Sequence, residues 1–273
     1  MSEAWTREEI ARYARHFVLP GVGEAGQRRL KASRVLVIGA GGLGSPVLLY
    51  LAAAGVGRIG VVESDRVEPS NLNRQVLYTE ADVGQSKAEV ARRRLLALNP
   101  HIEVVAYPER FTPELAERIV PEYDLLVDAS DNFPTRYLAN DAAVLFDRPL
   151  VQGAIYRFEG QLSVFHHRGG PCYRCLFRRP PRRQPACSEA GVFGVLPGTV
   201  GALMATEALK VLLELGEVLS GKLLLYDALE AGFRTLAFPR DPGCPVCGER
   251  PTIRSLREQN YEDVCQGPSG VES

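Results

Sequence analysis

A glycine-rich segment, Gly39-Ala40-Gly41-Gly42-Leu43-Gly44, has the spacing of a loop that holds phosphate groups. It follows the β-branched run 34–38 and precedes an apolar stretch typical of a helix. Glycines let the backbone approach phosphate oxygens, and a helix N-terminus offers unpaired N–H groups and a partial positive charge. Glu63 comes 19 residues after Gly44, where a carboxylate can accept hydrogen bonds from ribose hydroxyls. We therefore expect a nucleotide bound by Gly39, Gly41, Gly42, Leu43, Gly44 and Glu63, although this pattern alone suits NAD, FAD or ATP.

Three further polar segments lie next to predicted strands or helices. Residues 70–75 follow the second predicted strand, 84–87 open the next helix, and 130–132 follow the fourth strand. Ligands of open α/β sheets bind at the carboxyl ends of the strands, so these segments should converge on the glycine loop. Arg74 and Lys87 can neutralise a polyphosphate, and Asp131 can hold Mg²⁺. The other polar residues that we expect to contact the nucleotide are Asp65, Asn71, Gln75 and Asn132. Hydride transfer does not need such a set, so ATP and phosphoryl or nucleotidyl transfer are favoured.

Four of the six cysteines form two Cys-x-x-Cys pairs, Cys172 with Cys175 and Cys244 with Cys247, with 68 residues between the pairs. Four thiolates can close a tetrahedral Zn²⁺ site, and we expect a structural one. A redox function is the alternative, but a redox pair normally stands alone at a helix N-terminus. Cys187 follows arginines at 178, 179, 182 and 183, which would lower its pKa and favour the thiolate.

The elements that must position these residues alternate between strands and helices. Strands are predicted at 34–38, 58–63, 102–106, 124–128 and 149–153, and helices at 45–54, 86–98 and 134–145. This order predicts a mostly parallel Rossmann-like sheet with helices on both faces. The runs 161–166, 222–227 and 233–238 should extend the same sheet, the last as an antiparallel neighbour. The fold class is therefore α/β.

Composition excludes several classes of function. The formal net charge is −1, from 32 basic and 33 acidic side chains, so the overall balance favours neither nucleic acid nor an anionic membrane. The polar and acidic N-terminus does not resemble a secretory signal. The most apolar stretch, 195–213, carries Glu207 and Lys210 and is more typical of a core helix than of a membrane span. We expect a cytoplasmic protein.

The segments 39–45, 70–75, 84–87 and 128–132 together resemble the ubiquitin-activating superfamily, most closely the bacterial molybdopterin-synthase and thiamine sulfur-carrier adenylyltransferases, including those that serve tRNA thiolation. The resemblance runs from about Tyr13 to Gly248. It implies an enzyme that adenylates the C-terminal glycine of a small ubiquitin-like sulfur carrier ending in Gly-Gly, giving an acyl-adenylate and pyrophosphate. Glu63 departs from the family pattern, which frequently has aspartate there.

The resemblance also implies a homodimer in which Arg15 reaches the phosphates of the neighbouring subunit's site, and zinc at the four paired cysteines. Cys187 matches a mobile cysteine that captures the activated carrier in some members; an incidental exposed thiol is an equally good reading. The segment around Cys265 resembles a linker that precedes a rhodanese domain in longer relatives, so we expect a separate sulfur donor, a cysteine desulfurase or a rhodanese. We assign Cys265 no function.

The resemblance divides the chain into an adenylation domain at 1–248 and a partly disordered tail at 249–273. Within the domain we expect N-terminal helices at 6–32, a nucleotide-binding half at 33–153 and a carrier and zinc half at 154–248. An NAD-dependent oxidoreductase remains the alternative. A non-catalytic binding module is disfavoured because Arg15, Arg74, Lys87 and Asp131 are all present. Which carrier the enzyme serves is left open.

Overall fold

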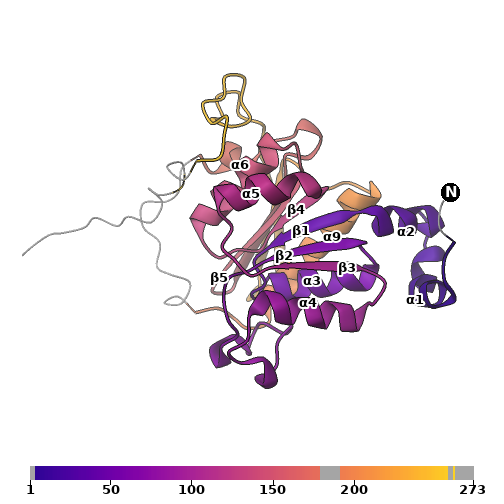
Figure 1. Ribbon diagram of the computed structural model, residues 1–273. Helices are drawn as coiled ribbons and strands as arrows, with labels where there is room; N and C mark the ends of the chain where they lie inside the picture. The colour runs from indigo at the N-terminus through magenta and orange to yellow at the C-terminus, as the bar shows by residue number, and fades with distance from the viewer. Residues whose placement is uncertain (1–3, 179–190, 258–260, 262–273) are drawn as a thin grey trace, which may run out of the picture.

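The computed structural model describes residues 4–178, 191–257 and 261 and contains one eight-stranded sheet (Figure 1). The strand order is β3-β2-β1-β4-β5-β6-β7-β8. The strands are β1 (Arg34–Ile38), β2 (Arg58–Val62), β3 (Glu103–Tyr107), β4 (Leu125–Asp128), β5 (Leu150–Tyr156), β6 (Glu159–Phe165), β7 (Lys222–Asp227) and β8 (Gly232–Ala237). The first five pair in parallel and the last three antiparallel, which confirms the predicted α/β class.

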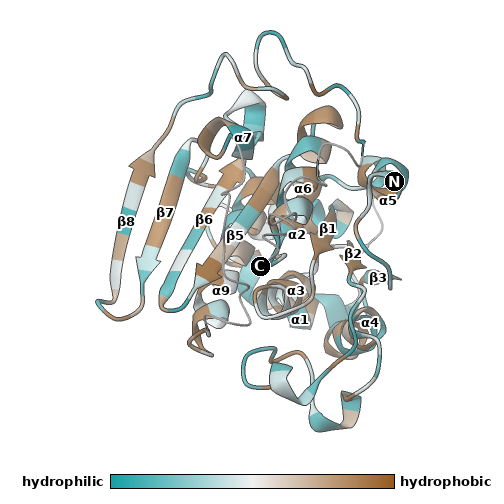
Figure 2. Ribbon diagram, turned by 90° about the vertical axis from the view of Figure 1, so that its left-hand side faces the viewer, coloured by the Kyte–Doolittle hydropathy of each residue, from teal (hydrophilic) through white to brown (hydrophobic). Residues whose placement is uncertain are grey.

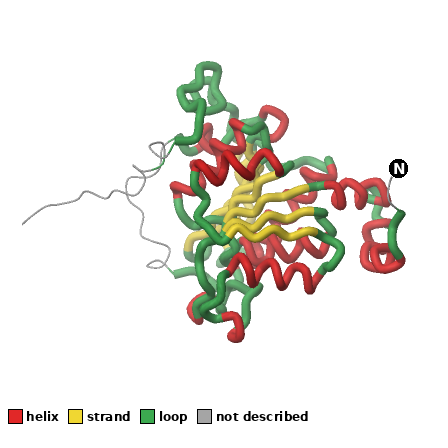
Figure 3. Tube along the Cα trace, in the orientation of Figure 1, coloured by secondary structure: helices red, strands yellow, loops and turns green. Residues whose placement is uncertain are grey.

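Helices cover both faces of the parallel half, as the tube in Figure 3 shows. The α-helices with described bounds are α1 (Arg7–Phe17), α2 (Gly23–Ala32), α3 (Gly44–Ala54), α4 (Lys87–Leu98), α5 (Pro113–Ile119), α6 (Phe133–Leu145), α7 (Tyr173–Leu176) and α9 (Leu196–Leu213). In Figure 1, α5 and α6 lie on one side of the sheet and α3 and α4 on the other. Helices α1 and α2 stand at one end of the molecule, beside the N-terminus.

The core has two apolar layers because side chains alternate along each buried strand. Val35 and Val37 of β1 belong to the layer under α3, α4 and α9, whereas Leu36 and Ile38 face α5 and α6. Both sets are buried, which explains why these strands read as continuous apolar runs. Because the sheet is packed on both faces, it holds the polar residues at its strand ends in fixed positions.

Local signals in the sequence explain several helix ends. Asn132 caps the N-terminus of helix α6, and its Oδ1 accepts a hydrogen bond from the Thr135 N–H at 3.0 Å. Helix α3 ends at Gly55, which has the left-handed φ of 83°. Helix α5 was not predicted, because a seven-residue element is too short to show a helical period. Its start is nevertheless signalled by Thr112, which caps the helix, and by Pro113.

Helix α9 is the one helix among the described residues that is long and apolar enough to cross a membrane by length and composition. It packs against α3, β5 and β6, and 56% of it is buried within the molecule. A core helix of a large α/β sheet has the same character, as the sequence predicted for this stretch.

The described part of the segment expected to be a tail contacts the body of the protein. Residues 249–257 form no helix or strand, but Leu256 is buried in the apolar layer under α6. Tyr261 is 6% exposed, and its hydroxyl donates a hydrogen bond to Asp141 at 3.1 Å. Contacts of this kind between distant segments leave no signal in the local sequence.

Candidate functional site

A cavity of about 1310 Å³ opens at the carboxyl ends of β1, β2 and β4. Eleven of the residues predicted to bind the nucleotide or to act on it line this cavity. They are Gly39, Gly41, Gly42, Leu43, Glu63, Asp65, Arg74, Gln75, Lys87, Asp131 and Asn132. The strand-end rule thus brought together residues that are up to 93 positions apart in the chain, from 39 to 132.

The glycine loop is held tightly against the neighbouring strand end. Gly39 has a φ of 93°, and a Cβ there would lie 2.9 Å from the Ala129 carbonyl oxygen, so only glycine fits. Gly41, by contrast, has room for a methyl group on the protein side. Helix α3 starts at Gly44, but the Ser45 N–H donates to the Gly41 carbonyl oxygen at 2.9 Å and Pro46 has no N–H. The attraction for an anion therefore comes from the loop backbone and from the positive end of the helix dipole. The loop therefore has the geometry of an anion site.

Glu63 serves the loop as well as the cavity. One carboxylate oxygen accepts a hydrogen bond from the Ala40 N–H at 3.1 Å, and the other accepts one from the Asp65 N–H at 2.9 Å. Each oxygen keeps a further lone pair, so the side chain can still accept a hydrogen bond from a ribose. Glu63 was predicted to accept hydrogen bonds from ribose hydroxyls, and the structure shows that it also holds the glycine loop in place.

Two cations flank the loop. The Lys87 ammonium pairs with Asp65 at 3.1 Å, and its side chain is only 6% exposed. Arg74 is half-buried and donates to the Ser70 carbonyl oxygen at 2.9 Å and to Asn73 at 3.0 Å. Both positive groups are oriented before any ligand arrives, which reduces the entropy lost on binding a polyphosphate.

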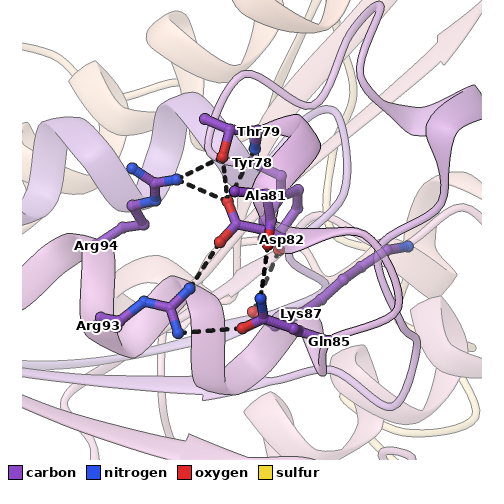
Figure 4. A network of polar contacts seen from close by, with 8 residues as sticks. All are labelled: Tyr78, Thr79, Ala81, Asp82, Gln85, Lys87, Arg93 and Arg94. Atoms are coloured by element: carbon purple, nitrogen blue, oxygen red, sulfur yellow. Dashed lines mark hydrogen bonds and ion pairs between the residues drawn. The ribbon is translucent and has the colours of Figure 1, made fainter.

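The loop between β2 and α4, which carries Arg74, is pinned to α4 by Asp82 (Figure 4). Asp82 accepts hydrogen bonds from Arg93 at 2.6 Å and Arg94 at 2.7 Å, and from the Thr79 hydroxyl at 2.8 Å. Burial alone would raise the pKa of Asp82, but the bonds from Arg94 and Thr79 outweigh it and lower that pKa to about 2. These contacts of Asp82, the Asp82 clasp, fix the loop that leads into α4, whose first residue is Lys87.

Asp131 is exposed in the cavity, at the turn between β4 and α6. Behind it, Asp128 is fully buried, which raises its pKa, while the nearby Arg136 guanidinium opposes that rise. Arg136 also donates to the Ser130 carbonyl oxygen at 3.3 Å. Among the described residues that have a buried polar atom without a hydrogen-bond partner, Gln75, Ser130 and Arg136 line the cavity. Unpaired polar atoms at a cavity wall agree with a polar ligand site there.

Some predicted site residues lie elsewhere. Asn71 does not line the cavity; its Oδ1 accepts a hydrogen bond from the Glu68 N–H at 3.1 Å and so shapes the loop. Gly44 lies one residue below the cavity wall, at the start of α3. Arg15 is exposed on α1 and does not line the cavity of its own chain. Cys187 and Cys265 fall outside the described residues. The roles expected of Asn71, Gly44, Arg15 and Cys187 stay predictions.

The cavity also has walls that the sequence reading missed. Glu109, Arg110 and Phe111 follow β3, and the same strand-end rule would have found them. Arg136 lies in the first turns of α6, and Tyr261 enters from the C-terminal segment. Nothing in the local sequence signals either contact, because each depends on how distant elements pack.

The four paired cysteines meet as predicted, with their sulfur atoms all within 4.8 Å of one another. The Sγ atoms of Cys172 and Cys244 are 3.5 Å apart, and those of Cys172 and Cys175 are 3.8 Å apart. These distances are too long for disulfides. Sulfurs bound tetrahedrally about 2.3 Å from zinc lie about 3.8 Å from one another, so the cluster has the size of a zinc site. Arg240 donates to the Cys247 carbonyl oxygen and supports the second pair.

Comparison with known proteins decides between the nucleotides that the glycine loop leaves open. The model of the ThiF family matches residues 13–246. The chain belongs to the ThiF family. An NAD-dependent oxidoreductase is accordingly not favoured. The resemblance to the ubiquitin-activating superfamily, expected from four segments, is confirmed across most of the chain.

Individual relatives agree with the family. The chain is 64% identical to the sulfur carrier protein adenylyltransferase of Thermus thermophilus, over 96% of this chain and 98% of that protein. It is 52% identical to the adenylyltransferase and sulfurtransferase MOCS3 of Bos taurus, over 96% of this chain but only 58% of that longer protein. Among solved structures, the ThiF-family chain is similar to E. coli MccB crystallised with ATP. The TM-score is 0.75 and the identity 28%, over 87% of this chain and 73% of MccB.

Proposed function

We propose that this chain transfers the adenylyl group of ATP to the C-terminal glycine carboxylate of a small ubiquitin-like sulfur carrier. The observation that carries the proposal is the convergence of the glycine loop, two oriented cations and an exposed carboxylate, Asp131, in one cavity. The names of the Thermus and bovine relatives support the adenylyltransferase activity, and the likeness to MccB with ATP supports the nucleotide.

The reaction follows from these residues. A carboxylate oxygen of the carrier attacks the α-phosphorus of ATP, the bond from that phosphorus to the bridging oxygen breaks, and pyrophosphate leaves with the electron pair. The glycine loop and the N-terminus of α3 hold the phosphates, while Glu63 orients the loop and accepts from the ribose. Arg74 and Lys87 offset the repulsion between the attacking carboxylate and the phosphates, and Lys87 exchanges part of its contact with Asp65 for phosphate.

Two metals fit the residues present. Mg²⁺ would be held by Asp131 and the ATP phosphates, and would neutralise charge on the leaving pyrophosphate. Zn²⁺ would be held by Cys172, Cys175, Cys244 and Cys247, whose spacing suits a closed structural site. The zinc would join the segment near 172 to the segment near 244 and stabilise the fold rather than take part in the chemistry.

Further parts of the proposal concern partners. The enzyme acts as a homodimer in the cytoplasm, and Arg15 reaches the phosphates in the neighbouring subunit; its exposed place on α1, off its own cavity, supports this role. Sulfur comes from a separate protein, a cysteine desulfurase or a rhodanese. The Cys187 thiolate attacks the glycine carbonyl carbon of the acyl-adenylate, forms a thioester with the carrier and releases AMP. If Cys187→Ala sulfurates the carrier at the normal rate, the covalent step is wrong.

The test is carrier-dependent exchange of labelled pyrophosphate into ATP. Purified protein is assayed with the carriers of the molybdopterin, thiamine and tRNA-thiolation pathways in turn, each also as a version lacking the final glycine. Exchange with an intact carrier, and none with its truncated control, is the expected result. Absence of exchange with every carrier, from protein that is folded and binds ATP, would refute the proposed function.

A further inference from the structure

The two residues between Cys172 and Cys175 are unusually well buried. Tyr173 is 2% exposed and Arg174 is 7% exposed. Binding of zinc at such a knuckle requires only the cysteine sulfurs, so it does not explain the burial of these two side chains. Here they form the short helix α7, which packs against α6 (Figure 2). Helix α6 is the element that begins beside Asp131.

Arg174 makes a bidentate ion pair with Asp141 of α6. Its Nε and one terminal nitrogen donate to the two oxygens of Asp141, each at 2.7 Å. Asp141 is fully buried, and it also accepts from Tyr261 at 3.1 Å. The guanidinium lies over the Tyr137 ring, 4.6 Å from the ring centre. Burying two charges costs desolvation free energy, so a buried ion pair is weak evidence that it stabilises the fold. The planar guanidinium does, however, fix the position and rotation of α7 relative to α6.

Tyr173 gives α6 a second anchor. Its backbone N–H donates to the Asn140 side-chain oxygen at 2.6 Å, and its ring meets Tyr137 edge-on with 5.2 Å between the ring centres. The first knuckle therefore contacts α6 through Asn140, Asp141 and the Tyr137 ring.

The start of α6 holds the turn that presents Asp131. Arg136 donates to the Ser130 carbonyl oxygen at 3.3 Å and faces the buried Asp128. Asn132 caps the helix through the Thr135 N–H. From Asn132 to Asp141 the helix spans about 13 Å at 1.5 Å per residue, so it is a short rigid link between the cysteine cluster and the cavity.

We propose that Arg174 and Tyr173 are positioning residues that connect the cysteine cluster to the active site. They fix α6, and through Arg136 and Ser130 they fix the turn that aims Asp131 at the ATP-bound metal. The part concerning Asp131 rests on the proposed function. Zinc binding and correct placement of Asp131 are then coupled, although the two sites lie at opposite ends of the link.

The test compares Arg174→Met with the matched control Arg254→Met. Arg254 follows the second knuckle and is exposed, and its Nε donates to the Pro251 carbonyl oxygen at 3.1 Å. Bound zinc is measured by mass spectrometry. The Mg²⁺ dependence of pyrophosphate exchange is measured at saturating carrier. Hydrogen exchange of peptides covering 128–136 is followed without carrier, before and after addition of ATP and Mg²⁺.

For Arg174→Met we expect one zinc per chain, as in the unaltered protein, and faster hydrogen exchange at 128–136. The Mg²⁺ concentration for half-maximal activity should rise about 10- to 100-fold, as for residues that orient metal ligands. The carrier KM should not change, and Arg254→Met should match the unaltered protein. Arg174→Lys keeps the charge but loses the bidentate geometry, and should fall between them.

Unaltered Mg²⁺ dependence and hydrogen exchange in a zinc-loaded Arg174→Met protein would overturn the proposal. Loss of zinc in proportion to loss of activity would overturn it too, since the residue would then serve the cluster alone. If Arg174→Met does not fold, Arg174→Lys and Asn140→Ala decide by the same readouts. Failure of the proposed function appears instead as no exchange by the unaltered protein, while the hydrogen-exchange comparison still reports on the link.

Discussion

Replacing Gly41 with alanine should separate nucleotide binding from folding. Gly41 lines the cavity and does not have a positive φ, so alanine can adopt its backbone conformation. A Cβ there would meet only the Gln75 side-chain nitrogen, at an ordinary contact distance of 3.5 Å. A Gly-to-Ala change at a compatible position is neutral or stabilising by about 0.4–1 kcal/mol. The folded protein should therefore tolerate Gly41→Ala without loss of Tm.

ATP should not tolerate the same methyl group. The loop binds phosphate by close approach of its backbone, and displacing the phosphates removes at least one charged hydrogen bond, worth about 1.5–3 kcal/mol. That loss corresponds to about 10- to 100-fold weaker ATP binding. Thermal unfolding gives the Tm, and titration with ATP gives the Kd for the unaltered protein and for Gly41→Ala.

Gly198→Ala is the matched control, because Gly198 lies in the first turn of α9, off the cavity wall, with no atom near its Cβ position. It should leave both Tm and ATP affinity at or above their normal values. Unchanged ATP affinity in Gly41→Ala would refute the placement of the phosphates on this loop. A large fall in its Tm would refute the reading of the local space.

Three other perturbations test separate parts of the structure. Asp82→Asn should destabilise the protein by about 1–3 kcal/mol at pH 7. Because the folded-state pKa is lowered to about 2, the stabilisation by this carboxylate is present above about pH 4 and is lost as the pH falls toward 2. Denaturant unfolding across that range should thus converge for Asp82→Asn and the unaltered protein, and parallel curves would contradict the clasp. Cys244→Ser should lose zinc and much of its stability, since structural zinc in finger peptides contributes about 10–16 kcal/mol; zinc-free unaltered protein with normal Tm would contradict this. Asp131→Ala should retain its Tm but lose about 10²–10³-fold in carrier-dependent exchange, and near-normal exchange would exclude the magnesium role.

The sequence by itself determined the local features of this protein. Strand runs, helix caps and turn glycines act between residues that are close in the chain, so their periods and spacings identified the α/β order and the glycine loop. The strand-end rule extended this reading to Arg74, Lys87 and Asp131, because parallel strands bring their carboxyl ends to one edge whatever the connections between them. The Cys-x-x-Cys spacing likewise indicated the four-sulfur cluster before any contact was known.

Only the tertiary structure decided which distant side chains contact one another. Glu63 accepts a hydrogen bond from the Ala40 N–H, and Arg174 of α7 pairs with Asp141 of α6. Tyr261 of the C-terminal segment donates to the same carboxylate. Each contact joins residues 23 to 120 positions apart. No period or spacing in the sequence encodes such a contact, since it exists only once the sheet has set the distance between the elements.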